Sequence, residues 1–185
     1  MDIAALQPDH AEQAAALLVE AFAQHWPQAW PTMEDARAEL HEVLAPDRVS
    51  LAATSDGALL GWIGALPTDY GPQTWELHPL VVAPAHQRRG VGRALVEALT
   101  RLLEQRGVLT LLLGSDDEDE MTSIGGRDLY PDVLGHLSRI EDHKGHPYAF
   151  YRRLGFAVVG VVPDANGPGR PDILMARRLS PRHAP

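Results

Sequence analysis

Cysteine is absent from this sequence of 185 residues. Disulfide bonds, thiolate metal ligands and a cysteine nucleophile are therefore excluded. The sequence also lacks an apolar run of about 18 residues, which a membrane-spanning helix would need. Its first residues show neither the basic nor the apolar region of a secretory signal. We therefore expect a cytoplasmic protein with no membrane partner.

Positive charge is also scarce, with 16 lysines and arginines against 25 acidic residues and a net charge of -9. Nucleic acid is a poor candidate partner, because phosphate binding requires a basic surface. Segment 116–142 alone holds nine acidic residues and two arginines. This segment is either a solvated acidic loop or a surface that attracts a cationic ligand.

Apolar periodicity and turn residues predict alternating helices and strands, and thus an α/β fold with a mixed central sheet flanked by helices. We expect one domain, 1–185, because no linker divides the chain. Thr32 and Asp35 form a predicted capping box. The pattern is also compatible with a short strand near Ile3 and a helix within 132–142. Predicted helices cover 10–22, 32–45, 91–107 and 147–155, predicted strands cover 48–54, 58–66, 75–82, 109–113, 156–162 and 172–178, and predicted loops cover 67–74 and 163–171.

The segment Gln87-Arg88-Arg89-Gly90-Val91-Gly92 lies between a predicted strand and a predicted helix. Glycines at such a junction let the backbone approach a ligand closely. The helix N-terminus carries a partial positive charge that suits phosphate, and the two arginines add to it. A glycine pair before a helix is also found in simple tight turns, so this pattern alone leaves both interpretations open.

The preceding strand, Trp75-Glu76-Leu77-His78-Pro79-Leu80-Val81-Val82, places Glu76, His78 and Leu80 on one face. Pro79 cannot donate to a β-ladder, which predicts a break in strand pairing, such as a bulge. Taken singly, Glu76 is better interpreted as a surface carboxylate and His78 as a structural histidine than as catalytic residues.

Strand and turn together resemble the GCN5-related N-acetyltransferase (GNAT) family, whose signature Q/R-x-x-G-x-G/A is matched by Gln87, Gly90 and Gly92. The resemblance implies the acyl-CoA N-acyltransferase fold, with splayed strands at the acetyl-CoA site. It is closest for the aminoglycoside 6'-N-acetyltransferase subgroup and runs from about Leu60 to Arg178. The blocks that carry it are 75–82, 116–117, 128–130, 146–156, 159–167 and 170–173.

The resemblance implies a role for each matching residue. Glu76 and His78 would bind the amine or accept its proton, and the Leu80 amide would contact the oxyanion. Tyr151 would lie beside the CoA sulfur and protonate the leaving thiolate, although it also fits a core cluster of aromatic residues. Acetyl-CoA would be bound by Val81, Val82, Gln87, Arg88, Arg89, Gly90, Val91, Gly92 and Arg93.

The resemblance says less about the residues that would bind the acetyl acceptor. It implies that Asp116 and Asp117 bind a cationic sugar, and that the protein forms a homodimer. Trp26 belongs to a segment that we expect near the acceptor, but the resemblance does not extend to it. No metal is expected, because His143 and His146 are separated by a loop sequence and lack supporting ligands.

The sequence therefore predicts transfer of an acetyl group from acetyl-CoA to a small cationic amine, with the 6'-amine of an aminoglycoside as the first choice. Within the same fold, a polyamine, another small amine or a basic protein is an alternative acceptor. An acyl-CoA-binding module without turnover is an alternative of another class.

Overall fold

The computed structural model describes residues 1–179 and confirms the predicted α/β fold. Two compact units make up the chain: residues 1–111 with Leu179, and residues 112–178. The strands are β1 (Asp2–Ala5), β2 (Val49–Ser55), β3 (Ala58–Thr68), β4 (Gly71–Val82), β5 (Thr110–Asp116), β6 (Ala157–Val162) and β7 (Asp172–Arg178). The helices are α1 (Ala11–Phe22), α2 (Met33–Val43), α3 (Val91–Gln105), α4 (Val133–Ser138) and α5 (Pro147–Arg153), with single 3-10 turns at η1 (Pro8–His10) and η2 (Pro84–His86).

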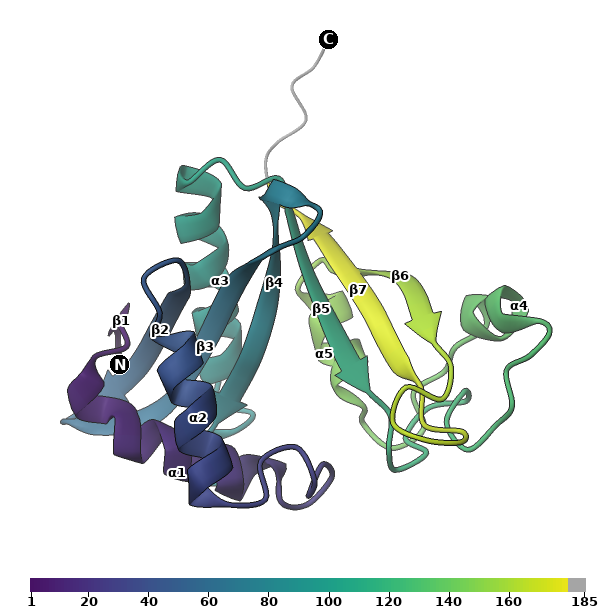
Figure 1. Cartoon of the computed structure of the whole chain (residues 1–185), viewed down its shortest axis with the longest axis horizontal. Helices are drawn as coiled ribbons and strands as arrows, with labels where there is room; N and C mark the ends of the chain where they lie inside the picture. The colour runs from purple at the N-terminus through teal and green to yellow at the C-terminus, as the bar shows by residue number, and fades with distance from the viewer. Residues whose placement is uncertain (180–185) are drawn as a thin grey trace, which may run out of the picture. The chain divides into compact units, whose positions relative to one another are not determined.

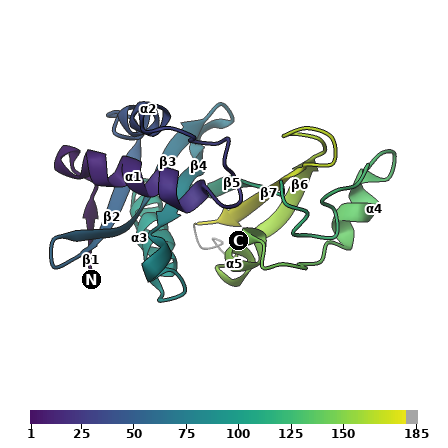
Figure 2. The same ribbon diagram turned by 90° about the horizontal axis from the view of Figure 1, so that it is seen from below.

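The first unit is built on strands β1 to β4, which pair in that order, each antiparallel to the next. Helices α1 and α2 cover one face of these strands and α3 covers the other (Figures 1 and 2). Trp62 of β3 is fully buried beneath α1, where its indole N–H donates to the Ala14 carbonyl oxygen at 3.1 Å. The apolar core between helices and sheet thus fixes α1 and α2 against β3 and β4.

Local signals in the sequence account for the helices of this unit. The predicted capping box is present: the Asp35 N–H donates to the Thr32 hydroxyl, and the Thr32 N–H donates to the Asp35 carboxylate. In α3, Leu95 and Leu99 are fully buried one turn apart, as a helix with one apolar face requires. None of the helices within residues 1–179 is long and apolar enough to cross a membrane.

The loop predicted at residues 67–74 is wrong. Strand β3 continues to Thr68 and β4 begins at Gly71, so a tight hairpin joins them. Pro67 is tolerated in the strand because the pairing register shifts immediately after it, between Pro67 and Thr68. A proline at such an irregularity does not have to donate a ladder hydrogen bond.

The predicted break near Pro79 is confirmed. Ile63 pairs with Leu80 and Ala65 with Leu77, so two residues of β4, His78 and Pro79, lie opposite one residue of β3. This is a bulge in β4. The residue opposite the bulge is Gly64, and a Cβ atom there would collide with the His78 carbonyl oxygen. A glycine is therefore required for β3 to approach the bulge this closely.

The second unit contains the strands β5, β7 and β6, which are neighbours in that order. Strands β6 and β7 are antiparallel. The predicted helix at 147–155 is confirmed as α5, and the one within 132–142 as the short α4. Residues 117–132 form an extended loop that a buried carboxylate holds in shape, as described below.

Candidate active site

Strand β4 carries the predicted catalytic residues of the first unit. Along this strand Glu76, His78 and Leu80 are partly exposed and alternate with the buried Leu77 and Val81. The bulge changes which face the following side chains take. Glu76 pairs with Leu66 and Val81 with Trp62, on the face that α1 and α2 cover, whereas Leu80 pairs with Ile63 on the opposite face. The prediction that Leu80 shares a face with Glu76 and His78 is therefore wrong, although its predicted contact comes from the backbone amide and not from the side chain.

His78 has partners from two segments that precede it by more than 35 residues. Its Nε2 lies 3.6 Å from Glu39 Oε1 of α2, and the Trp30 ring lies 5.8 Å away between centroids. Burial alone would lower the pKa of His78, but the Glu39 carboxylate, with a smaller contribution from Glu76, raises it above the ordinary value.

Glu39 and Trp30 are the residues that sequence reasoning missed. Glu39 adjoins the buried positions Ala36, Leu40 and Val43 of α2, and its side chain is only 16% exposed. The Trp30 side chain is one of the neighbours that lower the pKa of its carboxyl. An acidic residue at the border of an apolar helix face was the available signal, because such a carboxylate requires a partner.

Trp26 belongs to an aromatic group beside these residues. Its ring lies 5.6 Å from Phe22, and the Phe22 ring lies 4.7 Å from Trp30 in an edge-on contact. Since Trp30 also contacts His78, the segment that the resemblance did not cover reaches the predicted catalytic face. Whether Trp26 itself binds an acceptor stays a prediction.

The turn before α3 has the geometry that a phosphate site requires. Gly90 has a φ of 89°, in the left-handed region, and a Cβ atom there would meet nothing within 4 Å. Helix α3 has 15 residues and no side-chain cap, so the amides of Val91, Gly92 and Arg93 lack intrahelical acceptors. The exposed arginines at 88, 89 and 93 surround this helix end. The turn therefore fits the pyrophosphate of CoA.

Two predicted cofactor contacts have other structural roles. The Gln87 side-chain amide donates to the Val82 carbonyl oxygen at 3.2 Å, which ties the turn to the end of β4. The Val81 side chain belongs to the buried core, so any contact with a ligand would come from its backbone. Val82 is partly exposed on the other face of the strand.

Tyr151 lies on α5 in the second unit and is 8% exposed. Its ring contacts Phe150 and Phe156, with centroids 5.1 and 5.6 Å away. Burial raises the pKa of its hydroxyl, so Tyr151 stays protonated across the physiological range. A protonated hydroxyl is what a hydrogen-bond donor to a thiolate requires.

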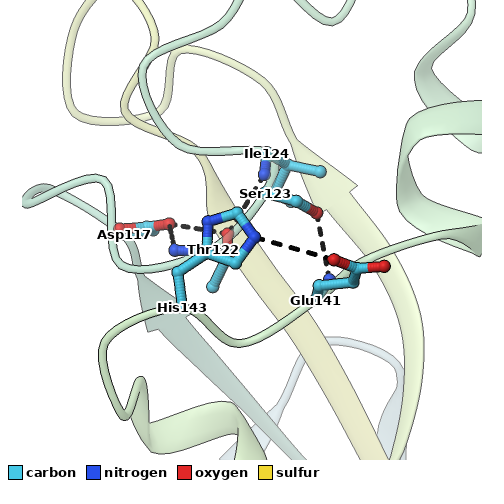
Figure 3. A network of polar contacts seen from close by, with 6 residues as sticks. All are labelled: Asp117, Thr122, Ser123, Ile124, Glu141 and His143. Carbon is cyan, nitrogen blue, oxygen red and sulfur yellow. Dashed lines mark hydrogen bonds and ion pairs between the residues drawn. The ribbon is translucent and has the colours of Figure 1, made fainter.

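Asp117, predicted to bind substrate, holds the loop after β5 (Figure 3). Its carboxylate is fully buried and accepts hydrogen bonds from the Met121 N–H at 2.7 Å, the Thr122 N–H at 2.9 Å and the Thr122 hydroxyl at 2.7 Å. The Thr122 hydroxyl in turn accepts from the Ile124 N–H. The described side-chain hydrogen bonds of Asp117 are thus with its own loop, and its role toward a substrate stays a prediction.

Asp116 is partly exposed, and its carboxylate accepts a hydrogen bond from the Asn166 side chain at 2.5 Å. Its carbonyl oxygen lies 3.0 Å from Nε2 of the buried His146. The His146 Nδ1 accepts from the Tyr148 N–H at 3.1 Å, at the start of α5. His146 therefore links the acidic end of β5 to the helix that carries Tyr151.

Burial, with a smaller contribution from Asp116, raises the pKa of the neighbouring Glu118. This shows how closely the negative charges of the segment are spaced. Within residues 1–179, no three His, Asp or Glu side chains are arranged to hold a metal ion. Glu76, His78, Leu80 and the glycine turn belong to the first unit, and Tyr151 and the acidic residues to the second.

Comparison with known proteins agrees with this geometry. The profile of the acetyltransferase (GNAT) family matches residues 12–125, whereas no curated protein matched. A solved aminoglycoside 6'-N-acetyltransferase complexed with coenzyme A is 35% identical, with a TM-score of 0.89 and 100% of both chains covered. The aminoglycoside 6'-N-acetyltransferase from Enterococcus faecium is also 35% identical, with a TM-score of 0.87 and 100% of both chains covered. A type Ii aminoglycoside 6'-acetyltransferase is 34% identical over 98% of this chain and 99% of its own, with a TM-score of 0.74. The chain therefore belongs to the GNAT family of acetyltransferases.

Proposed function

We propose that this acetyl-CoA-dependent N-acetyltransferase acetylates the 6'-amine of aminoglycosides. One observation carries the proposal: 35% identity over the full length of solved enzymes with that activity, one of them complexed with coenzyme A. The net charge of -9 agrees with a polycationic acceptor. The cytoplasmic location and the homodimer expected from the sequence remain predictions.

The reaction requires a neutral amine. A lysine-like amine with a pKa of about 10.4 loses its proton at pH 7 at a cost of about 4.6 kcal/mol. In our proposal Glu76 and His78 bind the ammonium group, and one of them accepts the proton, directly or through water. The nitrogen then attacks the thioester carbonyl carbon of acetyl-CoA.

In our proposal three further groups of the chain take part in the later steps. The Leu80 amide stabilises the oxyanion of the tetrahedral intermediate. The C–S bond then breaks, the acetyl group stays on nitrogen, and the CoA thiolate leaves, while the nitrogen releases its remaining extra proton to solvent. Tyr151 donates a hydrogen bond to this thiolate and passes it a proton, which the tyrosine regains from solvent. The α3 N-terminus and the Gly90 turn hold the pyrophosphate throughout.

The test measures CoA thiol release from acetyl-CoA with kanamycin, spermidine or a lysine-rich peptide as acceptor. We expect the highest kcat/KM with kanamycin, and a product acetylated at the 6' position by NMR. Faster release with spermidine or the peptide would reject the aminoglycoside and favour the alternative acceptors. Binding of CoA without thiol release from any acceptor would favour the non-catalytic module.

A further inference from the structure

We propose that Glu39 of α2 is a positioning residue for His78, fixing the orientation of its imidazole and selecting which ring nitrogen accepts a proton. The inference rests on the proposed function, in which His78 faces the acceptor amine. It adds a residue that neither the family signature nor the sequence analysis assigns.

The first argument is the way the Glu39 carboxylate is held. Helix α2 is fixed by its buried residues Ala36, Leu40 and Val43, which hold the Glu39 backbone in place. Only 16% of the Glu39 side chain is exposed, whereas 64% of the Glu42 side chain on the same helix is exposed. A carboxylate restricted in this way can orient a neighbouring group, since little conformational entropy remains to be lost.

The second argument is the side of the imidazole that Glu39 faces. Its Oε1 lies 3.6 Å from Nε2 of His78, so the neutral ring is favoured with its hydrogen on Nε2. The lone pair then resides on Nδ1, which becomes the nitrogen that accepts a proton. A carboxylate behind a catalytic imidazole plays the same part in hydrolytic triads.

The third argument is the charge around His78. The charged groups that act on it are Glu39 from α2, Glu76 from β4 and Arg48 from the segment before β2. The two carboxylates favour the protonated ring and Arg48 opposes it, with Glu39 the strongest of the three. The interaction also acts in reverse, because His78 and Trp30 hold the pKa of Glu39 below its ordinary value against the effect of burial. Glu39 therefore stays ionised and keeps the proton affinity of His78 high.

The direct test is an NMR titration of the histidine ring nitrogens in wild type, Glu39→Gln and Glu34→Gln, with His78 assigned by its loss in His78→Gln. Glu34→Gln is the matched control, because it removes the same charge from an exposed position of the same helix. We expect the His78 midpoint to fall in Glu39→Gln alone, with a loss of the preference for hydrogen on Nε2. Equal midpoints in all three proteins would overturn the proposal.

Kinetics test whether this coupling serves the reaction. The acid limb of kcat/KM reports the pKa of the base in the free enzyme. We expect that limb to move to lower pH in Glu39→Gln, with a plateau about 10-fold lower, a fraction of the 10²- to 10⁴-fold that a general base contributes. Glu39→Asp, which restores the charge, should recover most of the shift. A changed His78 midpoint with an unmoved acid limb would overturn the positioning role.

The titration separates this inference from the proposed function. It needs no acceptor, so it reports on Glu39 and His78 even if kanamycin is not a substrate. If another amine is acetylated faster, the kinetic comparison uses that amine, and the aminoglycoside proposal fails alone.

Discussion

Replacing His146 by alanine tests the link between β5 and α5. The variant loses the acceptor of the Tyr148 N–H, which caps α5, at a cost of about 1 kcal/mol. It leaves the Asp116 carbonyl oxygen without this partner, which costs about 1–3 kcal/mol in a buried setting. It also removes a ring that is 1% exposed, which leaves a cavity. The sum is a loss of about 3–5 kcal/mol in the free energy of unfolding.

Thermal unfolding followed by calorimetry measures this loss. For a chain of this size we expect the Tm of His146→Ala to fall by roughly 10 °C. The matched control is His143→Ala, three residues earlier, where the ring is half exposed and its Nε2 lies 3.7 Å from a Glu141 oxygen. A surface pair of this kind contributes less than about 1 kcal/mol. Equal Tm values for the two variants would refute the assignment of His146 as a structural link.

The pH dependence of the same experiment has a defined sign. Burial lowers the pKa of His146 in the folded state, despite opposing contributions from nearby acidic groups. Below pH of about 6.5 the unfolded chain therefore gains a proton that the folded chain resists. The free energy of unfolding of the wild type therefore decreases as pH falls, and His146→Ala lacks this contribution. The difference in Tm between the two proteins should therefore become smaller in acid. A difference that widens below that pH would contradict the buried neutral ring.

Three further predictions concern the bulge opposite Gly64, the turn at Gly90 and the hydroxyl of Tyr151. Gly64→Ala should lower kcat/KM about 10-fold or more, because its Cβ would push the carbonyl of His78 and displace the bulge. An unchanged kcat/KM would contradict the close packing of Gly64 against His78. Gly90→Asp should weaken acetyl-CoA binding about 10-fold, as measured by calorimetry. Gly107→Asp is the control, because Gly107 also has a left-handed backbone but follows the other end of α3, and it should leave the affinity unchanged. Equal affinities of the two variants would exclude the Gly90 turn as the pyrophosphate site. Tyr151→Phe should lower kcat more than acetyl-CoA affinity, and undiminished kcat would exclude Tyr151 from the mechanism.

The sequence predicts those features of the fold that depend on neighbouring residues. The capping box at Thr32 and the apolar face of α3 are local patterns, and both are confirmed. The bulge at Pro79 was predictable because a missing N–H has the same consequence in any sheet. The hairpin at Thr68 was missed because prolines on both sides of it indicate a loop, and only the pairing register shows that the strands continue.

The site was predictable where a family signature spans consecutive residues, as in the turn at Gly90. It was not predictable where partners come from distant segments. Glu39 precedes His78 by 39 positions, and only the packing of α2 against the sheet brings their side chains together. Asp117 illustrates the converse case, since an acidic residue in an acidic run gives no indication that its side chain points inward.

The hydrogen bonds of Asp117 have an evolutionary consequence. In the run from Asp116 to Glu120, one buried carboxylate fixes the backbone of the loop, while exposed neighbours such as Glu120 face the solvent. The shape of the loop is thus encoded separately from most of its surface charge. A lineage under selection by a new amine can exchange the outer acids one at a time while the loop keeps its course, provided that Asp117 is retained.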